Sequence, residues 1–154
     1  MITKLFPALL LVASIGITGA SDEIDLNHFA VKYFEAKVAT QDPDATPQIL
    51  EAYLALLTED VGYEHKPYRI LGEVDGGKSR MRAGMTYYLG GNESYSAELV
   101  NVAVGHNAVA IQYKGIWSGT RSGEGATIFT KNFLVMEVLE ITDGKVSLIR
   151  EFSK

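Results

Sequence analysis

Two kinds of hydrophobic spacing divide the chain near Gly91. Before this point, apolar residues recur every three or four positions, first over 26–34 and again over 50–57. This spacing predicts helices, because residues three and four apart share one helical face. After Gly91 the stretches between turn residues have the length and the alternation of strands. The order is therefore helices first and strands afterwards.

The predicted helices have recognisable ends. Asp22 or Asp25 can cap the first helix, and Thr46–Pro47 supplies a cap followed by proline at the first helical position of the second. A third helix begins after Gly77 and stops at Gly90–Gly91, as helices often stop at glycine. The side chains on one of its sides are Met81, Met85, Tyr88 and Leu89.

The remaining segments predict an antiparallel sheet. A first strand at 60–65 lies between the second and third helices. Four more strands are expected at 95–104, 108–119, 127–141 and 145–152. Short turns at 105–107 and 142–144 make hairpins of these four, and the Asp143-Gly144 pair suits a tight turn. We therefore expect an α+β domain in which three helices cover one face of a curved antiparallel sheet.

Composition removes several classes of function. The 154 residues are 47% hydrophobic and 21% charged, as in a globular protein with a real core. The net charge of −5 argues against a nucleic-acid partner. The absence of cysteine excludes disulfides, thiolate nucleophiles and cysteine-ligated metals. The histidines His28, His65 and His106 lack the close spacing of a metal-binding helix, so no metal is expected. The glycines at 119–125 lack the following helix and the lysine of a phosphate-binding loop, and no other cofactor is expected.

Residues 1–20 differ in character from the remainder. Lys4 precedes an apolar run over 5–17, and small residues follow at 18–20. This layout predicts a secretory signal peptide, which leaves a mature domain of residues 21–154. The apolar run is short for a membrane span, so no stable membrane insertion is expected after cleavage. The predicted location is periplasmic or secreted.

The strand at 60–65 offers the best candidates for chemistry. Alternation puts Tyr63 and His65 on one face and Glu64 on the other. An unperturbed imidazole titrates near neutral pH, so His65 can take and return a proton. The alternative is a hydrogen-bonded histidine at a pocket rim with no chemical role.

Three further residues are candidates for ligand contact. Tyr33 lies in the apolar stripe of the first helix, so its buried hydroxyl needs a partner. That partner would be a ligand oxygen, His65 or a backbone carbonyl. Tyr88 belongs to the apolar side of the third helix. Arg150 and Glu151 point to opposite faces of the last strand, and we expect Arg150 on the pocket side, because Leu148 shares its parity.

The order and spacing of the elements resemble the nuclear transport factor 2-like superfamily, in particular its ketosteroid isomerases and SnoaL-like polyketide cyclases. The likeness rests on the segments at 30–34, 57–65 and 140–146. It implies a cone-shaped fold around a pocket, and a tendency to form homodimers. It also implies a general base at the end of the first strand, which is His65 here, and a tyrosine donor on the first helix, which is Tyr33. The position of the family's second donor falls near Met136, with Glu137 on the opposite face.

Three functions are open on the sequence alone. The first is an exported enzyme that isomerises, cyclises or dehydrates a carbonyl compound, with His65 as base and Tyr33 or Tyr63 as donor. The second is a non-catalytic carrier of a small apolar ligand, held near Tyr63, Tyr88 and Arg150. The third is an assembly domain that forms homodimers through the outer face of the sheet.

Overall fold

The computed structural model describes residues 24–66, 77–121 and 127–153; the predicted signal peptide lies outside them. Within these residues, three helices and five strands follow one another as the sequence predicts. They are α1 (Leu26–Ala39), α2 (Pro47–Leu54), β1 (Leu57–Lys66), α3 (Gly77–Tyr88), β2 (Ser94–Val104), β3 (Ala108–Arg121), β4 (Thr127–Thr142) and β5 (Lys145–Ser153). No helix in this part of the chain is long and apolar enough to cross a membrane. The α+β prediction is confirmed.

Side-chain caps define where α1 and α2 begin. The Asp25 carboxylate accepts hydrogen bonds from the backbone N–H groups of Asn27 and His28. The Thr46 hydroxyl accepts from the backbone N–H of Ile49, and Pro47 occupies the first turn of α2. These bonds satisfy N–H groups that the helix itself leaves without partners.

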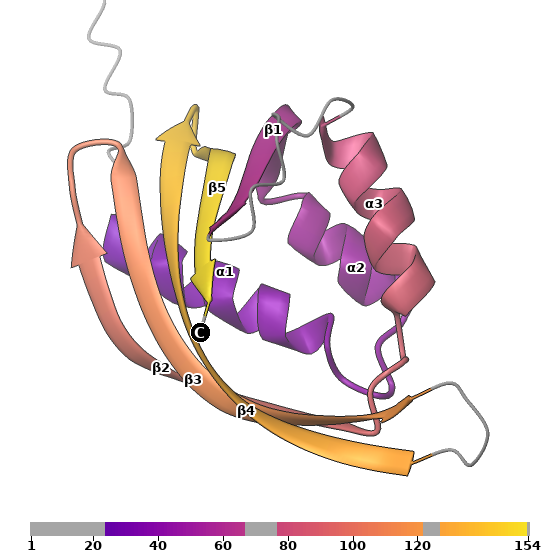
Figure 1. Cartoon of the computed structure of the whole chain (residues 1–154). Helices are drawn as coiled ribbons and strands as arrows, with labels where there is room; N and C mark the ends of the chain where they lie inside the picture. Colours follow the sequence, from indigo (N-terminus) through magenta and orange to yellow (C-terminus); the bar gives the residue numbers. More distant parts are fainter. Residues whose placement is uncertain (1–23, 67–76, 122–126, 154) are drawn as a thin grey trace, which may run out of the picture.

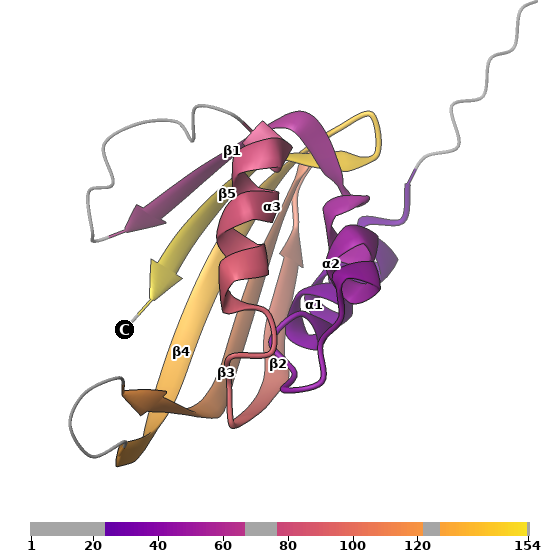
Figure 2. The same ribbon diagram turned by 90° about the vertical axis from the view of Figure 1, so that its right-hand side faces the viewer.

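The strands form one curved sheet in the order β1-β5-β4-β3-β2. The pairs β2–β3, β3–β4 and β4–β5 are antiparallel, whereas β1 runs parallel to β5. The three helices lie on the concave face of the sheet, with α1 running across it and α3 standing over it (Figures 1 and 2).

The hairpin between β4 and β5 determines which β5 side chains face inward. Its turn residues Asp143 and Gly144 both have positive φ, 48° and 75°, as a two-residue turn between twisted strands requires. Directly after the turn the register shifts, so that Glu140 pairs with Leu148 while Ile141 pairs with Val146. The extra residue, Ser147, forms a bulge, and a bulge reverses the face of the residues that follow it.

The hydrophobic core lies between the helices and the inner face of the sheet. Its fully buried members come from α1, α2 and four of the strands. The largest apolar ones are Tyr33, Leu50, Leu54, Leu57, Ile111, Leu139 and Ile149. Helix α1 contacts α2, β2 and β3, so it closes one end of the sheet. Burial of this kind stabilises by about 1.5–3 kcal/mol per large side chain.

Helix α3 packs against Glu59 and forms ion pairs along one of its sides. Gly77 begins it at φ +50°, and an added Cβ would lie 2.2 Å from the Glu59 carbonyl oxygen, so only glycine fits there. The Lys78 ammonium pairs with the Glu59 carboxylate at 2.6 Å, and Arg82 pairs with Glu51 at 2.6 Å. On the other side, a Cβ added at Gly84 would meet nothing within 4 Å. That open side faces the pocket.

Candidate functional site

A pocket of about 1120 Å³ lies between α3, the end of α1 and the concave face of the sheet. This volume slightly exceeds the usual range for small-molecule sites, which is about 300–1,000 Å³. Much of its wall is aromatic. The aromatic side chains are Tyr53, Tyr63, Tyr88, Tyr95, Tyr113, Trp117, Phe129 and Phe133. Besides Tyr88, the α3 side of the wall consists of Arg80, Met81, Gly84 and Met85. Such a wall suits a flat ligand with a large apolar part.

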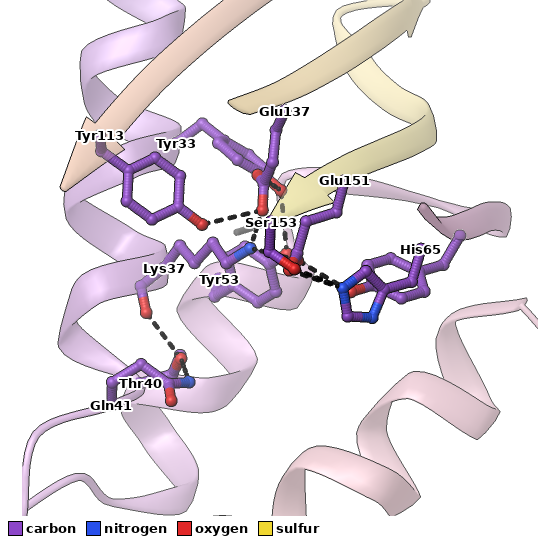
Figure 3. Close-up of polar contacts among 11 residues, drawn as sticks. Tyr33, Lys37, Thr40, Gln41, Tyr53, His65, Tyr113, Glu137, Glu151 and Ser153 are labelled. Carbon is purple, nitrogen blue, oxygen red and sulfur yellow. Dashed lines mark hydrogen bonds and ion pairs between the residues drawn. The ribbon is translucent and has the colours of Figure 1, made fainter. Parts of the chain in front are cut away.

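Three polar side chains gather where β1 and β5 end. The parallel pairing of these strands sets His65 opposite Glu151. The His65 Nε2 atom lies 2.7 Å from the Ser153 hydroxyl and 3.6 Å from Glu151 Oε1 (Figure 3). His65, Glu151 and Ser153 all line the pocket. Together they form the polar end of the pocket. The His65 imidazole can accept a proton, and the Glu151 carboxylate can stabilise the resulting imidazolium.

Behind this end lies a second carboxylate, Glu137 of β4, which is completely buried. Its Oε2 accepts a hydrogen bond from the Tyr33 hydroxyl at 3.0 Å, and its Oε1 accepts one from Tyr113 at 3.0 Å. The Lys37 ammonium also donates to Oε1. The Tyr33 hydroxyl lies 3.1 Å from that of Tyr53. A buried carboxylate needs such partners, because removing it from water costs several kcal/mol.

Lys37 links the two carboxylates. Its ammonium, bonded to Glu137, also lies 3.6 Å from Glu151 Oε2. The same Glu151 oxygen accepts a hydrogen bond from the Tyr63 hydroxyl at 2.8 Å. A continuous polar network therefore runs from the buried Glu137 through Lys37 and Glu151 to His65 (Figure 3).

Burial makes the tyrosines around this network hard to ionise. It raises the pKa of Tyr33 and Tyr53 above that of an exposed phenol, and it does the same, aided by the negative charge of Glu151, for Tyr63 and Tyr113. Burial also raises the pKa of Tyr95 to about 12. All five side chains are therefore neutral hydrogen-bonding groups at physiological pH.

These shifts predict a loss of stability in alkali. An exposed tyrosine ionises near pH 10. Above that pH the unfolded chain releases phenolic protons that the folded protein retains, so unfolding becomes more favourable. The expected loss is about 1.4 kcal/mol per pH unit for each tyrosine that ionises only on unfolding. Urea denaturation between pH 8 and about 12, with tyrosinate absorbance as a second signal, measures it. Constant stability across this range would contradict the burial of these tyrosines.

No family model and no curated protein matches the sequence of this chain. Comparison of the fold with solved structures, in contrast, gives many matches. One is a proposed SnoaL-like polyketide cyclase from Shewanella putrefaciens CN-32, with 13% identity, a TM-score of 0.64, and coverage of 86% of this chain and 91% of that one.

Two more matches have related folds. An LEH-like epoxide hydrolase from M. tuberculosis has 19% identity and a TM-score of 0.59 over 81% of this chain and 82% of that one. A protein with a ketosteroid isomerase-like fold from Catenulispora acidiphila DSM 44928, in complex with trimethylamine, has 14% identity and a TM-score of 0.53 over 77% and 82%. The chain has the nuclear transport factor 2-like fold. At this level of identity the likeness concerns the fold, and it confirms the cone-shaped fold that the sequence resemblance implies.

The nuclear transport factor 2-like cone brings three of the predicted site residues together. His65, Tyr63 and Tyr88 all line the pocket. His65 and Tyr63 come from β1, as the alternation of that strand predicts. Tyr88 is 73% exposed and lies in the last turn of α3. Their contributions to binding or catalysis remain predictions.

Two predicted site residues lie elsewhere. Tyr33 is fully buried and does not line the pocket, since its hydroxyl is bonded to Glu137 and Tyr53. The placement of Arg150 on the pocket side is wrong. It forms ion pairs with Glu64 and Glu140 on the other side of the sheet, and its neighbour Glu151 lines the pocket instead. The bulge at Ser147 is the reason, because it breaks the parity that links Arg150 to Val146.

Sequence reasoning missed Lys37, Glu137, Glu151 and Ser153. Two signals were present in the chain. Lys37 follows Tyr33 by four residues, so both lie on the same face of α1. Glu137 shares the parity of Val135 and Leu139, and a lone acid among inward-facing apolar residues marks a buried polar site. The expected outward orientation of Glu137 is wrong, and Met136, at 39% exposure, lies on the outer face.

Proposed function

We propose that the protein is an exported small-molecule enzyme that moves a proton on a carbonyl compound, with His65 as general base. The observation that supports this most strongly is the meeting of His65, Glu151 and Ser153 at one end of a large aromatic pocket. An imidazole beside a carboxylate, inside a cavity that fits an organic ligand, is an arrangement that suits general-base catalysis.

The reaction follows from the positions of these groups. The His65 Nε2 atom removes a proton from a carbon next to the substrate carbonyl, and Glu151, 3.6 Å away, stabilises the imidazolium that forms. The Ser153 hydroxyl, 2.7 Å from Nε2, fixes the ring and can turn aside when substrate enters. Return of the proton at another carbon isomerises the substrate. If the imidazolium instead returns the proton to a β-hydroxyl, the hydroxyl leaves as water and the reaction is a dehydration.

Fold neighbours add a general argument for a small-molecule ligand. They include an epoxide hydrolase, a proposed polyketide cyclase and a protein bound to trimethylamine. Because this fold supports many activities, the residues of the pocket rather than the fold decide the reaction in this protein.

Deuterium exchange tests the proposal even though the natural substrate is unidentified. The mature protein is incubated in D₂O with a panel of aryl ketones and cyclic ketones, and incorporation of deuterium is followed by mass spectrometry. Incorporation above the protein-free rate for at least one compound is expected. Tight binding of panel compounds with no exchange would instead favour the carrier of a small apolar ligand.

A homodimer through the outer face of the sheet is a second proposal. Exposed apolar side chains from three adjacent strands gather there: Ile116, Leu134, Met136 and Phe152. Met136 pairs with Phe152 across β4 and β5, so the patch is continuous between these strands. Contiguous apolar surface on a soluble domain often marks an interface.

Replacing this apolar surface is expected to separate the subunits. Leu134→Glu/Met136→Glu should give a monomer in sedimentation equilibrium under conditions in which the unchanged protein is a dimer, because two buried charges would face each other across the interface. Lys145→Glu, an exposed change in the β4–β5 turn region, serves as the control. A monomeric unchanged protein would contradict the proposal.

A further inference from the structure

The proposed reaction develops negative charge on the substrate oxygen, and that oxygen needs a donor. The tyrosines named by the sequence do not supply it. The Tyr33 hydroxyl donates to Glu137 and is sealed from the pocket, and the Tyr63 hydroxyl donates to Glu151. This inference rests on the proposed function and extends it to the group that receives the oxyanion.

Lys37 has the position that this role requires. It lies one helical turn beyond Tyr33 on α1, lines the pocket, and retains 17% exposure of its side chain. Its ammonium has three N–H donors. One is used by Glu137, and Glu151 lies 3.6 Å away, beyond hydrogen-bond distance. A ligand oxygen that enters this end of the pocket can therefore accept a hydrogen bond from Lys37.

The surroundings hold the ammonium in place. Glu137 is completely buried and is itself fixed by Tyr33 and Tyr113. The centroid of the Tyr113 ring lies 5.7 Å from the Lys37 nitrogen. A charge positioned before the substrate arrives needs no rearrangement during the reaction, which is the condition under which such donors accelerate it most.

Lys37 and His65 lie on either side of one carboxylate. The Lys37 nitrogen is 3.6 Å from Glu151 Oε2, and His65 Nε2 is 3.6 Å from Glu151 Oε1. Both side chains line the same pocket, so one substrate can present its carbonyl oxygen to Lys37 and the neighbouring carbon to His65. We propose that Lys37 is the catalytic residue that binds and stabilises the enolate oxygen of the substrate.

The step conserves atoms and electrons. The C–H pair becomes the C=C bond of the enolate as the proton passes to His65, and the carbonyl π pair moves to the oxygen held by Lys37. When the imidazolium returns the proton to carbon, the carbonyl reforms. No oxidant or reductant takes part.

Para-nitrophenol is a probe for this donor, because its ionised form is a flat aromatic oxyanion and is yellow. The proteins to compare are Glu137→Gln and Lys37→Met/Glu137→Gln, so that no variant leaves a buried carboxylate without its cation. We expect Glu137→Gln to bind the phenolate in preference to the phenol. Lys37→Met/Glu137→Gln should bind the phenolate about 10- to 100-fold more weakly, which is the usual value of a charged hydrogen bond, and should bind the phenol as well as Glu137→Gln does.

Arg80 provides the competing explanation, since it is another cation of the pocket wall and comes from α3. Arg80→Gln is therefore measured in parallel and should keep the phenolate preference. Equal phenolate affinity in the two Glu137→Gln proteins, or loss only in Arg80→Gln, would overturn the role of Lys37 and leave the proposed function intact. If the unchanged protein bound neither form, the proposed aromatic-ligand pocket and this inference would both fall.

Discussion

Replacing Lys37 with methionine is expected to lower the free energy of unfolding by about 3–5 kcal/mol, because it leaves a buried carboxylate without its cation. Glu137 is completely buried, and Lys37 is the cation bonded to it in the described structure. The hydrogen bonds from Tyr33 and Tyr113 remain, but neutral donors offset only part of the cost of burying a charge. Urea denaturation followed by circular dichroism measures the change.

Two further variants identify the cause. Adding Glu137→Gln to Lys37→Met should restore most of the lost stability, because the neutral amide still accepts from Tyr113, and Tyr33 can donate to Tyr53 instead. Lys114→Met removes an exposed partner of Glu98 and should cost no more than about 1 kcal/mol. If Lys37→Met cost as little as Lys114→Met, the buried ion pair would lack the strength that its burial implies.

Replacing His65 with alanine is expected to slow deuterium incorporation by about 10²- to 10⁴-fold for any panel compound that the protein exchanges. The reason is that His65 is the proposed base. Glu151 is the alternative base at this end, and it already accepts a hydrogen bond from Tyr63 and lies 3.6 Å from Lys37. Compound binding should weaken much less than exchange, because the aromatic wall is unchanged.

His106→Ala is the matched control for this substitution. His106 is exposed in the turn between β2 and β3 and is not among the residues that line the pocket. It tests whether removal of any imidazole affects exchange, and no effect is expected. Exchange that persisted at the full rate in His65→Ala would exclude His65 as the base and would turn attention to Glu151.

Local sequence signals were sufficient for the elements of the fold. Thr46–Pro47 marked the start of α2, and Asp143-Gly144 marked the last hairpin, where both residues adopt the positive φ that such a turn needs. The parallel pairing of β1 with β5 was not predicted. It joins residues far apart in the sequence, and no local pattern specifies such a partner.

The inward-facing residues of the candidate site were predicted correctly only where a regular strand fixes the direction of its side chains. Tyr63 and His65 face inward because β1 is regular between Gly62 and Lys66. Arg150 was misplaced because one extra residue, Ser147, reverses the face of β5. The partnership of Lys37 with Glu137 depends on how α1 crosses β4 in three dimensions, and hydrophobic spacing does not contain that information.

The most direct test of His65 as the base is a proton NMR experiment on its imidazole, with and without the panel of ketones. His65→Ala identifies the resonance by its disappearance. We expect that a compound that undergoes exchange also shifts the His65 resonance, while the signals of His28 and His106 remain in place. A compound that binds in the pocket and undergoes exchange, yet leaves the His65 resonance unchanged, would contradict this role.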